Sequence, residues 1–316
     1  MSASVELAGD WEERVRGALA RAGGVGEELG RGRVAVLGAG LDSVALVAEG
    51  VSGRFVLRLP KGEDGAEGIA REGRLLPELG ERVGLPIPRF VLMARNPLGP
   101  GEFCVYPMVP GEVVSAREWH RRGLVGAGTA RQVAGFLDEV HGFSVERAVE
   151  LGVEVADYRE EFEETLELLG AHVVPMLEHA EARVLVEAFE GYLGDAENFA
   201  YEPTLIHGDV SLDHLLITGD RISGVIDFGD TQIGDPDYDL CYLWTEAGPE
   251  FVRQVREYRG LPFDERLTGK LNFWAIADPT DDVLHGIEND MPEFRDSSRN
   301  RLVRALERYA AQTGTL

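Results

Sequence analysis

The stretch LIHGDVSLDHLLI, residues 205–217, places two histidines and two aspartates between apolar runs. A second stretch, GVIDFGDTQIGDPDYDL at 224–240, is also acidic and also begins with apolar residues. Short apolar runs bounded by polar loops are typical of buried strands. The two stretches therefore predict that carboxylates lie at the ends of neighbouring strands and face one cleft.

Three residues of these stretches form a chemical pattern. Asp209 follows the first strand, Asp227 ends the strand after the hairpin, and His214 lies where the loop turns back toward Asp227. Phosphoryl transfer needs one carboxylate to accept the proton of the acceptor hydroxyl and a second, with one further ligand, to hold Mg²⁺. We assign Asp209 to the first role and Asp227 with His214 to the second, although histidine is an unusual ligand for Mg²⁺.

The motifs HGDVSLDH, IDFGD and GDPDYDL resemble those of the aminoglycoside phosphotransferases, which have a protein-kinase-like fold. The usual catalytic loop of that family is H-x-D-x-x-x-x-N, and His214 stands at its last position, as in the 2″-aminoglycoside and macrolide branches. The segment is most similar to the 2″-aminoglycoside branch, because the macrolide branch more often has Trp where this chain has Phe228. The resemblance covers about residues 33–245.

The resemblance also implies a nucleotide site upstream. VLGAGLDSVALV at 36–47 matches the nucleotide loop, with Gly38 and Gly40 in place and Ser43 at the third glycine position. Arg58 occupies the place of the phosphate-binding lysine, and Glu72 that of its helical partner. Arginine also pairs with phosphate oxygens, so the resemblance implies an ion pair between Arg58 and Glu72.

CVYPMVPGE is the place of the hinge, where backbone groups recognise the purine. The resemblance assigns Tyr106, Pro107 and Val109 to this part of the site and leaves ATP or GTP open as phosphate donor. His207 has a scaffold role in kinase-like folds. Asp235 and Asp239 are expected to brace the catalytic loop.

The acceptor site is predicted from charge alone. An aminoglycoside carries several ammonium groups and needs carboxylates beside an apolar or aromatic wall. The candidates for this side are Asp230, Glu246, Trp274, Asp278, Asp281, Asp282 and Glu288. A solvated acidic helix face is the alternative interpretation for each acid.

Composition limits the partners. The 316 residues carry a net charge of −25, which argues against nucleic acid and is compatible with a cationic small-molecule substrate. Cys104 and Cys241 are separate and lie among apolar residues, which favours reduced thiols in the cytoplasm. No stretch reaches the roughly 20 apolar residues of a membrane span. We expect a cytoplasmic monomer or weak dimer.

Periodicity predicts a two-lobed α+β fold with a β-rich N-lobe and a larger helical C-lobe. The predicted N-lobe is 1–106, followed by a hinge at 107–111 and a C-lobe at 112–316 that holds the catalytic loop and the acceptor helices. Strands are expected at 33–37, 43–49 and 54–59, and the stretch 101–114 is expected to be a strand followed by a Pro/Gly connector. Helices are expected at 9–30, 64–83, 127–142, 156–198, 237–259, 263–289 and 298–313.

The function expected from this resemblance is transfer of the γ-phosphate of ATP or GTP, with Mg²⁺, to the 2″-hydroxyl of an aminoglycoside. Two alternatives stay open. The first is a kinase of a macrolide or an amino-sugar metabolite, because the fold does not fix the acceptor. The second is a nucleotide-binding pseudokinase, which the departures at Arg58 and His214 support and the intact Asp209 and Asp227 oppose.

Overall fold

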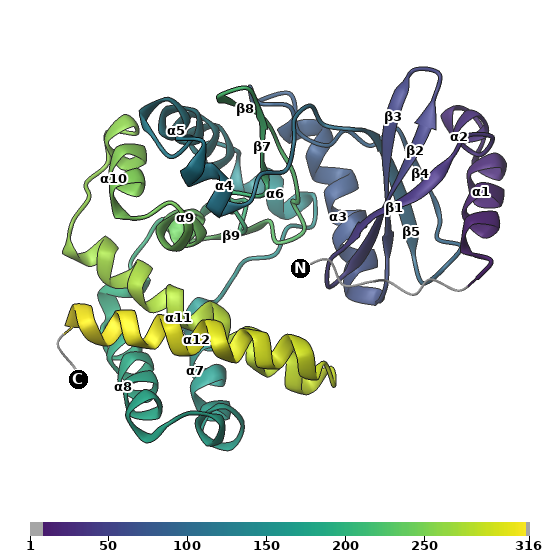
Figure 1. The fold of residues 1–316 in the computed structure, drawn as a ribbon. Helices are drawn as coiled ribbons and strands as arrows, with labels where there is room; N and C mark the ends of the chain where they lie inside the picture. Colours follow the sequence, from purple (N-terminus) through teal and green to yellow (C-terminus); the bar gives the residue numbers. More distant parts are fainter. Residues whose placement is uncertain (1–8, 314–316) are drawn as a thin grey trace.

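The computed structural model describes residues 9–313, which form two parts (Figure 1). The N-terminal part holds an antiparallel sheet in the order β1-β2-β3-β5-β4. Its strands are β1 (Val34–Ala39), β2 (Ser43–Gly50), β3 (Gly53–Pro60), β4 (Leu92–Arg95) and β5 (Glu102–Pro107). The expected two-lobed α+β architecture is confirmed.

The sheet separates two small cores, and β3 shows why. Because side chains alternate along a strand, Phe55, Leu57 and Leu59 pack on one face with the helices α1 (Trp11–Ala22) and α2 (Val25–Leu29). Val56 and Arg58 belong to the other face, which the helix α3 (Glu63–Leu79) covers. This alternation points Arg58 at Glu72 of α3, the helix that lies between the sheet and the larger part of the molecule (Figure 1).

The chain leaves β5 at Pro107, and Glu112 already pairs with Ile217 of the second part. Two short antiparallel pairs lie there, β6 (Thr204–Ile206) with β9 (Gln232–Gly234), and β7 (Leu215–Thr218) with β8 (Arg221–Val225). The α-helices of this part are α4 (Ala116–Arg121), α5 (Ala127–His141), α6 (Val145–Glu150), α7 (Tyr158–Leu168), α8 (His179–Gly194), α9 (Cys241–Glu246), α10 (Pro249–Tyr258), α11 (Glu265–Glu288) and α12 (Pro292–Thr313).

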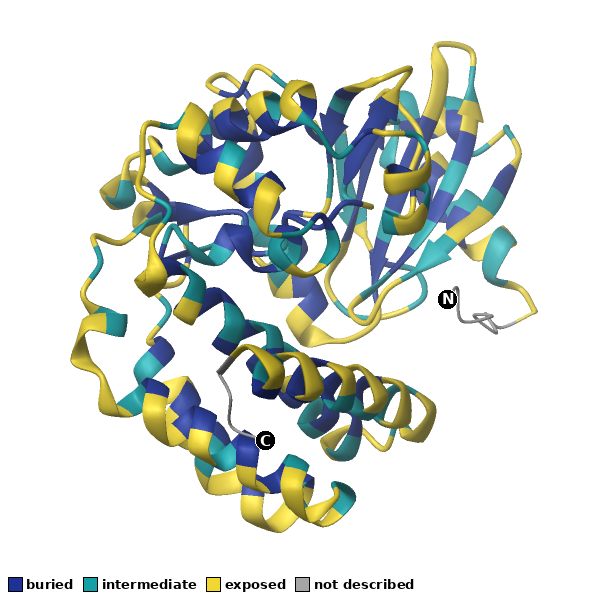
Figure 2. Cartoon of the chain, turned by 60° about the vertical axis from the view of Figure 1, so that its left-hand side comes forward, coloured by how far each residue is buried: buried dark blue, intermediate teal, exposed yellow. Residues whose placement is uncertain are grey.

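Aromatic packing fixes the helical group formed by α7, α8, α11 and α12. The Phe273 ring of α11 stacks on Tyr192 of α8, with 3.8 Å between centroids, and meets Phe162 of α7 edge-on at 5.0 Å. Helix α12 packs along α11 and also contacts α8. Figure 2 shows that these helices turn buried faces inward and keep exposed outer faces. No helix of residues 9–313 is long and apolar enough to cross a membrane.

Three predicted helices are interrupted, and each break has a local cause. The helix expected over 9–30 divides at Gly23 and Gly24, whose φ angles are +72° and +55°. The stretch expected as one helix over 156–198 contains a π-helical turn at Leu169–Val173 and a 3₁₀ turn at Val174–Met176. The helix expected over 237–259 starts as a 3₁₀ turn at Tyr238–Leu240 and ends at Gly248, whose φ is +91°. A further 3₁₀ turn spans Ala196–Phe199.

Candidate active site

The loop that carries Asp209 begins where β6 ends. Gly208 has a φ of +85°, and a Cβ built there would lie 2.2 Å from the backbone oxygen of Asp230. Only glycine therefore allows the two loops to cross this closely. The buried carboxylate of Asp239 supports the loop, because it accepts the N–H of Gly208 at 2.8 Å and that of His207 at 3.1 Å. The loop is held rigidly and presents Asp209 to the space between the lobes.

His207 has the scaffold role expected for it. Its side chain is fully buried, and its Nδ1 accepts the N–H of Asp209 at 3.2 Å. The opposite nitrogen, Nε2, lies 3.2 Å from the carbonyl oxygen of Ile226 and donates to it. Burial lowers the pKa of His207, so the ring is neutral and joins the strand before Asp227 to the loop that holds Asp209.

Asp209, His214 and Asp227 come together as the sequence predicted. His214 Nδ1 lies 3.2 Å from Asp209 Oδ2, and Nε2 lies 3.6 Å from Asp227 Oδ2. Burial alone would lower the pKa of His214, but the hydrogen bond and charge of Asp209, with the charge of Asp227, raise it to about 10. His214 is therefore an imidazolium that links the two carboxylates. It in turn holds the pKa of Asp209 below its usual value, against the effect of burial.

Asp227 is set out toward solvent, with half of its side chain exposed. Its φ of +66° is in the left-handed region, which is uncommon for a residue other than glycine. Across residues 9–313, no group of three or more His, Cys, Asp or Glu side chains is arranged to hold a metal ion. A cation here would therefore need ligands from a bound molecule beside Asp227, which is how Mg²⁺ usually binds with phosphates.

The predicted ion pair between Arg58 and Glu72 is present. Arg58 Nη1 lies 2.8 Å and 2.7 Å from the two carboxylate oxygens of Glu72, whose side chain is 1% exposed. Arg58 Nη2 also lies 3.6 Å from Asp227 Oδ1. Burial opposes the charge of Arg58, but Glu72 and Asp227 outweigh it and raise its pKa. The guanidinium therefore stays charged between α3 and the loop of Asp227.

The loop that carries Gly38 and Gly40 borders the same space between the lobes. The N–H of Gly40 bonds to the carbonyl of Ser43 at 3.0 Å, and Lys61 Nζ donates to the Gly40 carbonyl at 2.5 Å. A Cβ added at Gly38 or Gly40 would meet no protein atom within 4 Å. The space above these glycines is therefore open for a ligand to approach the backbone. Lys61 holds the tip of this loop.

The segment around the end of β5 packs two of its side chains into the protein core. Tyr106 is buried and stacks on Phe90, with 5.8 Å between centroids. Val109 is buried with it in the core on the α3 face, whereas Pro107 is exposed. Side chains here shape the wall, so any contact with a base would come from the backbone.

A cavity of about 550 Å³ lies between the lobes, and the predicted nucleotide residues Gly38, Tyr106, Pro107 and Val109 do not line it, since Tyr106 and Val109 pack into the core. It brings together eight of the predicted site residues, namely Gly40, Ser43, Arg58, Glu72, Asp209, His214, Asp227 and Asp230. Asp230 lines the cavity as an exposed residue, and its partial desolvation there, with the charges of Asp209 and Asp227, raises its pKa to about 6. Asp230 therefore belongs to the Asp209–Asp227 end of the cavity.

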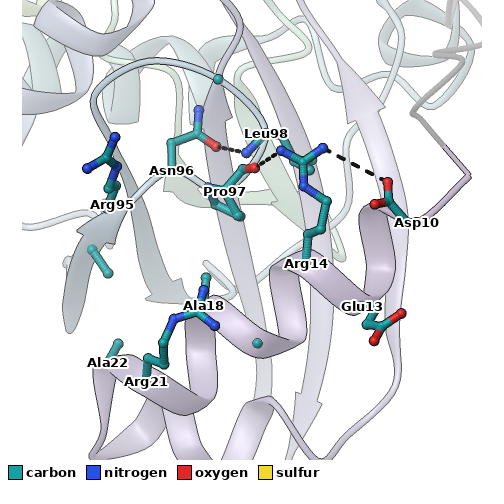
Figure 3. A pocket seen from close by; sticks show the side chains of 13 residues that line it. Asp10, Glu13, Arg14, Ala18, Arg21, Ala22, Arg95, Asn96, Pro97 and Leu98 are labelled. Atoms are coloured by element: carbon teal, nitrogen blue, oxygen red, sulfur yellow. Dashed lines mark hydrogen bonds and ion pairs between the residues drawn. The ribbon is translucent and has the colours of Figure 1, made fainter.

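A larger hollow of about 1100 Å³ lies elsewhere, between α1 and the loop after β4 (Figure 3). Arg14 donates to the carbonyl of Pro97 there and lies 3.9 Å from Asp10. Arg21 and Arg95 face the same hollow (Figure 3). It is on the sheet face opposite α3, and none of the predicted site residues lines it. Size alone therefore does not identify the functional cavity.

The acceptor-side candidates other than Asp230 make different contacts, and none of them lines the cavity between the lobes. Asp278 accepts a hydrogen bond from Tyr242 at 2.6 Å, and Asp281 accepts one from Thr165 at 3.0 Å, both on α11. Glu246 accepts the N–H of Leu212 at 2.7 Å and so supports the turn that carries His214. Trp274 is 1% exposed and packs among Tyr238 and Lys270 in the core. The structure therefore does not place Trp274 on a cavity wall.

Asp282 and Glu288 are the remaining candidates. Asp282 pairs with Arg301 of α12, and Glu288 is an exposed residue at the end of α11. Neither lines the cavity between the lobes.

Sequence reasoning missed several supporting residues. His141 of α5 bonds to Asp239 at 2.8 Å, so Asp239 braces the catalytic loop as expected. Asp235 instead pairs with the buried Lys270 of α11, which explains why that lysine is tolerated in an aromatic surrounding. Arg71 of α3 reaches the loop of Asp227. No sequence signal marked these partners, because each contact joins segments far apart in the chain.

The fold and this site together define a kinase-like phosphotransferase. The model of the phosphotransferase enzyme family, APH, matches residues 33–271, and the chain belongs to this family. The GDP complex of a point mutant of aminoglycoside 2'-phosphotransferase-IIIa is similar with a TM-score of 0.80 and 30% identity, over 89% of this chain and 92% of that one.

The GDP and kanamycin complex of APH(2")-IIIa is similar with a TM-score of 0.78 and 29% identity, over 89% of this chain and 93% of that one. Among curated proteins, the uncharacterized protein YcbJ of Bacillus subtilis strain 168 is 24% identical over 236 residues, which is 69% of this chain and 72% of YcbJ.

Proposed function

We propose that this phosphotransferase moves the γ-phosphate of ATP or GTP to the 2″-hydroxyl of an aminoglycoside, with Asp209 as the base. The observation that carries the proposal is the meeting of Asp209, Asp227 and Arg58 in one cavity, with His214 linking the two carboxylates. Modification of the antibiotic would confer resistance on a cell that holds the enzyme.

The donor side follows from the open glycine loop. Backbone groups at Gly38, Gly40 and Ser43 cover the phosphates, and Arg58 pairs with their oxygens while Glu72 orients it. The purine base of the nucleotide lies against the hinge at 107–111. This hinge joins an N-lobe of 1–106 to a C-lobe of 112–316. The similar APH(2")-IIIa has a structure with GDP, which supports a guanine nucleotide here and leaves ATP as the alternative donor.

Asp227 supplies the carboxylate for Mg²⁺, and the phosphates supply further oxygens. Its exposed side chain and its place beside the phosphate loop fit this role. His214 joins as a ligand only after it loses its proton, because an imidazolium has no free lone pair. A divalent cation held by Asp227 would supply positive charge beside the phosphates, where negative charge develops during transfer.

Asp209 accepts the proton of the acceptor hydroxyl. As that oxygen forms its bond to the γ-phosphorus, the bond from phosphorus to the β–γ bridging oxygen breaks, and the nucleoside diphosphate leaves. The pKa of Asp209 is held low, so the carboxylate is ionised at neutral pH and takes the proton as the hydroxyl becomes acidic in the transition state.

The acceptor lies toward α11. Asp278 of α11 accepts a hydrogen bond from Tyr242 outside the cavity lining, and burial, with the charges of Asp282 and Asp209, raises its pKa to about 6. Asp281 lies one turn further along α11. The cavity itself is lined by carboxylates that include Asp42, Glu154 and Asp230, which favours an acceptor that carries ammonium groups over an apolar macrolide.

The test is a coupled nucleotide-turnover assay with Mg²⁺, run separately with ATP and GTP against kanamycin, other aminoglycosides, macrolides and amino sugars. We expect turnover with 4,6-disubstituted aminoglycosides, and an NMR spectrum of the product that places phosphate at the 2″ position. Turnover with macrolides alone would contradict the proposed acceptor. Nucleotide binding without any turnover would favour a pseudokinase.

The base assignment has its own variant. Asp209→Asn should lower kcat by about 10²- to 10⁴-fold and retain nucleotide binding, because only the proton acceptor is removed. Asp213→Asn is the matched control, since Asp213 is an exposed neighbour of His214 and is absent from the cavity lining. If Asp209→Asn keeps wild-type turnover, Asp209 is not the base.

A further inference from the structure

Arg71 of α3 reaches across to the loop that follows Asp227. Its Nη2 donates to the carbonyl oxygen of Gly229 at 2.6 Å, although the two residues are 158 positions apart. Its side chain is 18% exposed, and Nη1 lies 3.8 Å from the solvent-exposed Glu154. The bond to Gly229 is thus the shorter and better shielded of the two contacts.

The loop needs such a support, because Asp227 has the left-handed φ of +66°. For a residue with a side chain this conformation is strained and persists only where neighbouring contacts impose it. Before Asp227, the N–H of Ile226 bonds to the carbonyl of His214 at 3.1 Å. After it, Arg71 holds the carbonyl of Gly229. The strained residue is therefore fixed on both sides.

Two neighbouring residues of α3 act on the same aspartate by different routes. Glu72 holds Arg58, whose Nη2 lies 3.6 Å from the Asp227 carboxylate. Arg71 holds the backbone two residues further on. We propose that Arg71 is a positioning residue, which keeps the Asp227 carboxylate oriented for a divalent cation bound with the nucleotide. This inference rests on the proposed role of Asp227.

The hydrogen bonding of the guanidinium supports this role. Arg71 Nε is buried and has no hydrogen-bond partner. A buried donor without a hydrogen-bond partner costs free energy. If Arg71 served local packing alone, a side chain without this N–H donor would be more favourable. The bond from Nη2 to the Gly229 carbonyl offsets that cost and serves the loop.

Arg74 offers a matched control one turn further along α3. Its Nε donates to the carbonyl oxygen of Leu151 at 2.7 Å, so it also joins α3 to a backbone carbonyl of the second lobe. It does not contact the loop at 227–230, and it is absent from the cavity lining. Loss of a lobe-to-lobe contact is thus shared by variants at both positions, whereas loss of support for Asp227 is particular to Arg71.

The experiment measures how strongly Mg²⁺ tightens the binding of fluorescent mant-GDP and mant-ADP, as the ratio of Kd in EDTA to Kd in Mg²⁺. The variants are Arg71→Met, Arg71→Lys and Arg74→Met. We expect Arg71→Met to lower this ratio about tenfold, since a hydrogen bond from a charged donor is lost. Arg71→Lys keeps a hydrogen-bond donor, so its ratio should lie between those of the wild type and Arg71→Met. The ratio of Arg74→Met should match that of the wild type.

The sign of the change separates positioning from charge. Arg71 is a cation, so removal of its charge alone would strengthen binding of Mg²⁺ and raise the ratio. A ratio that rises in Arg71→Met, equals that of the wild type, or falls equally in Arg74→Met would overturn the inference. So would a wild-type ratio of one, because Asp227 would then hold no cation.

This measurement needs no acceptor. If the wild type transfers no phosphate to any acceptor and the ratio still falls only at Arg71, the proposed function fails and the inference stands. If phosphate is transferred and the ratio does not respond to Arg71, the inference alone fails.

Discussion

His214 shows how neighbours set the chemistry of a single side chain. Two carboxylates from different loops face its two nitrogens, at 3.2 Å and 3.6 Å, and their charges outweigh the effect of burial on its pKa. The imidazolium thereby keeps Asp209 ionised, although that residue is largely enclosed. At this scale, local geometry decides whether a histidine is a cation, a base or a ligand.

Asp278 leads to a prediction on stability and pH. Its side chain is 21% exposed, and burial raises its pKa to about 6 against the hydrogen bond from Tyr242. The native state thus binds a proton more tightly than the unfolded chain, so the free energy of unfolding falls as pH rises from about 4 to about 6. Asp278→Asn removes this loss and should be about 1–2 kcal/mol more stable than the wild type at pH 8, with no difference at pH 4.

Urea denaturation at a series of pH values measures this difference. Tyr242→Phe serves as the opposing control, since it removes the hydrogen bond that lowers the pKa of Asp278 and keeps the carboxylate. Its destabilisation should be larger at pH 8 than at pH 4. Parallel stability curves for the wild type and Asp278→Asn over the whole pH range would refute the argument.

The loop that carries Asp209 depends for its shape on contacts with other elements of the fold. The loop takes its shape from three sources: the strand that precedes it, the carboxylate of Asp239 behind it, and the close crossing of Gly208 over Asp230. His141 of α5 completes the support of Asp239. Because each support comes from another element, the loop forms only when the second lobe has assembled.

Gly208→Ala tests the crossing. The change combines the strain of a positive φ with a clash at 2.2 Å against a backbone oxygen, which cannot move aside cheaply. We expect a loss of stability above about 2 kcal/mol and a fall in kcat, since Asp230 and Asp209 must separate.

Gly219→Ala is the matched control for that variant. Gly219 has a φ of +67° in the hairpin between β7 and β8, but a Cβ there meets nothing within 4 Å. It should cost only about 1 kcal/mol and leave kcat unchanged. Equal losses in the two variants, measured by urea denaturation and steady-state kinetics, would show that strain alone matters and the crossing does not.

Over the whole molecule, contacts from α3 join the two lobes. Arg74 donates to the carbonyl of Leu151, and Glu78 accepts from Arg147 of α6 at 2.6 Å. The helix that positions Arg58 therefore contacts the sheet on one side and the second lobe on the other (Figure 1). Between the lobes lies the cavity, in a chain whose net charge is −25.

That net charge predicts a dependence on salt. A cationic acceptor is attracted by the field of the protein, and salt screens this attraction with a Debye length of about 10 Å at 0.1 M. We expect the KM of an aminoglycoside to rise several-fold between 50 and 300 mM NaCl, with kcat changed less. The KM of the nucleotide, which is an anion, is the internal control and should not rise in the same way. A KM for the acceptor that is flat across this range would contradict electrostatic attraction.

Much of the site could be predicted from the sequence, because its signals are local. Apolar runs that end in Asp209 and Asp227 specify two strand ends, and strand alternation sets Arg58 on the face opposite Leu57 and Leu59. The sheet and the helical second lobe follow from such patterns, whereas the pair of Arg58 with Glu72 was implied by the family resemblance. The helix breaks were missed where glycines outweighed a continuing apolar period, as at Gly248.

What the sequence by itself determined was the two-lobed class and the set of polar side chains, Asp209, His214 and Asp227, that line the cavity between the lobes, since residue type and short-range spacing encode both. Only the tertiary structure decided that His214 carries a proton, that Trp274 is in the core, and that Arg71 bonds to Gly229. The physical reason is that burial and charge depend on which distant segments meet. The local periodicity of the sequence does not predict that α11 packs on α8. It also does not predict that α3 contacts a loop 158 positions away.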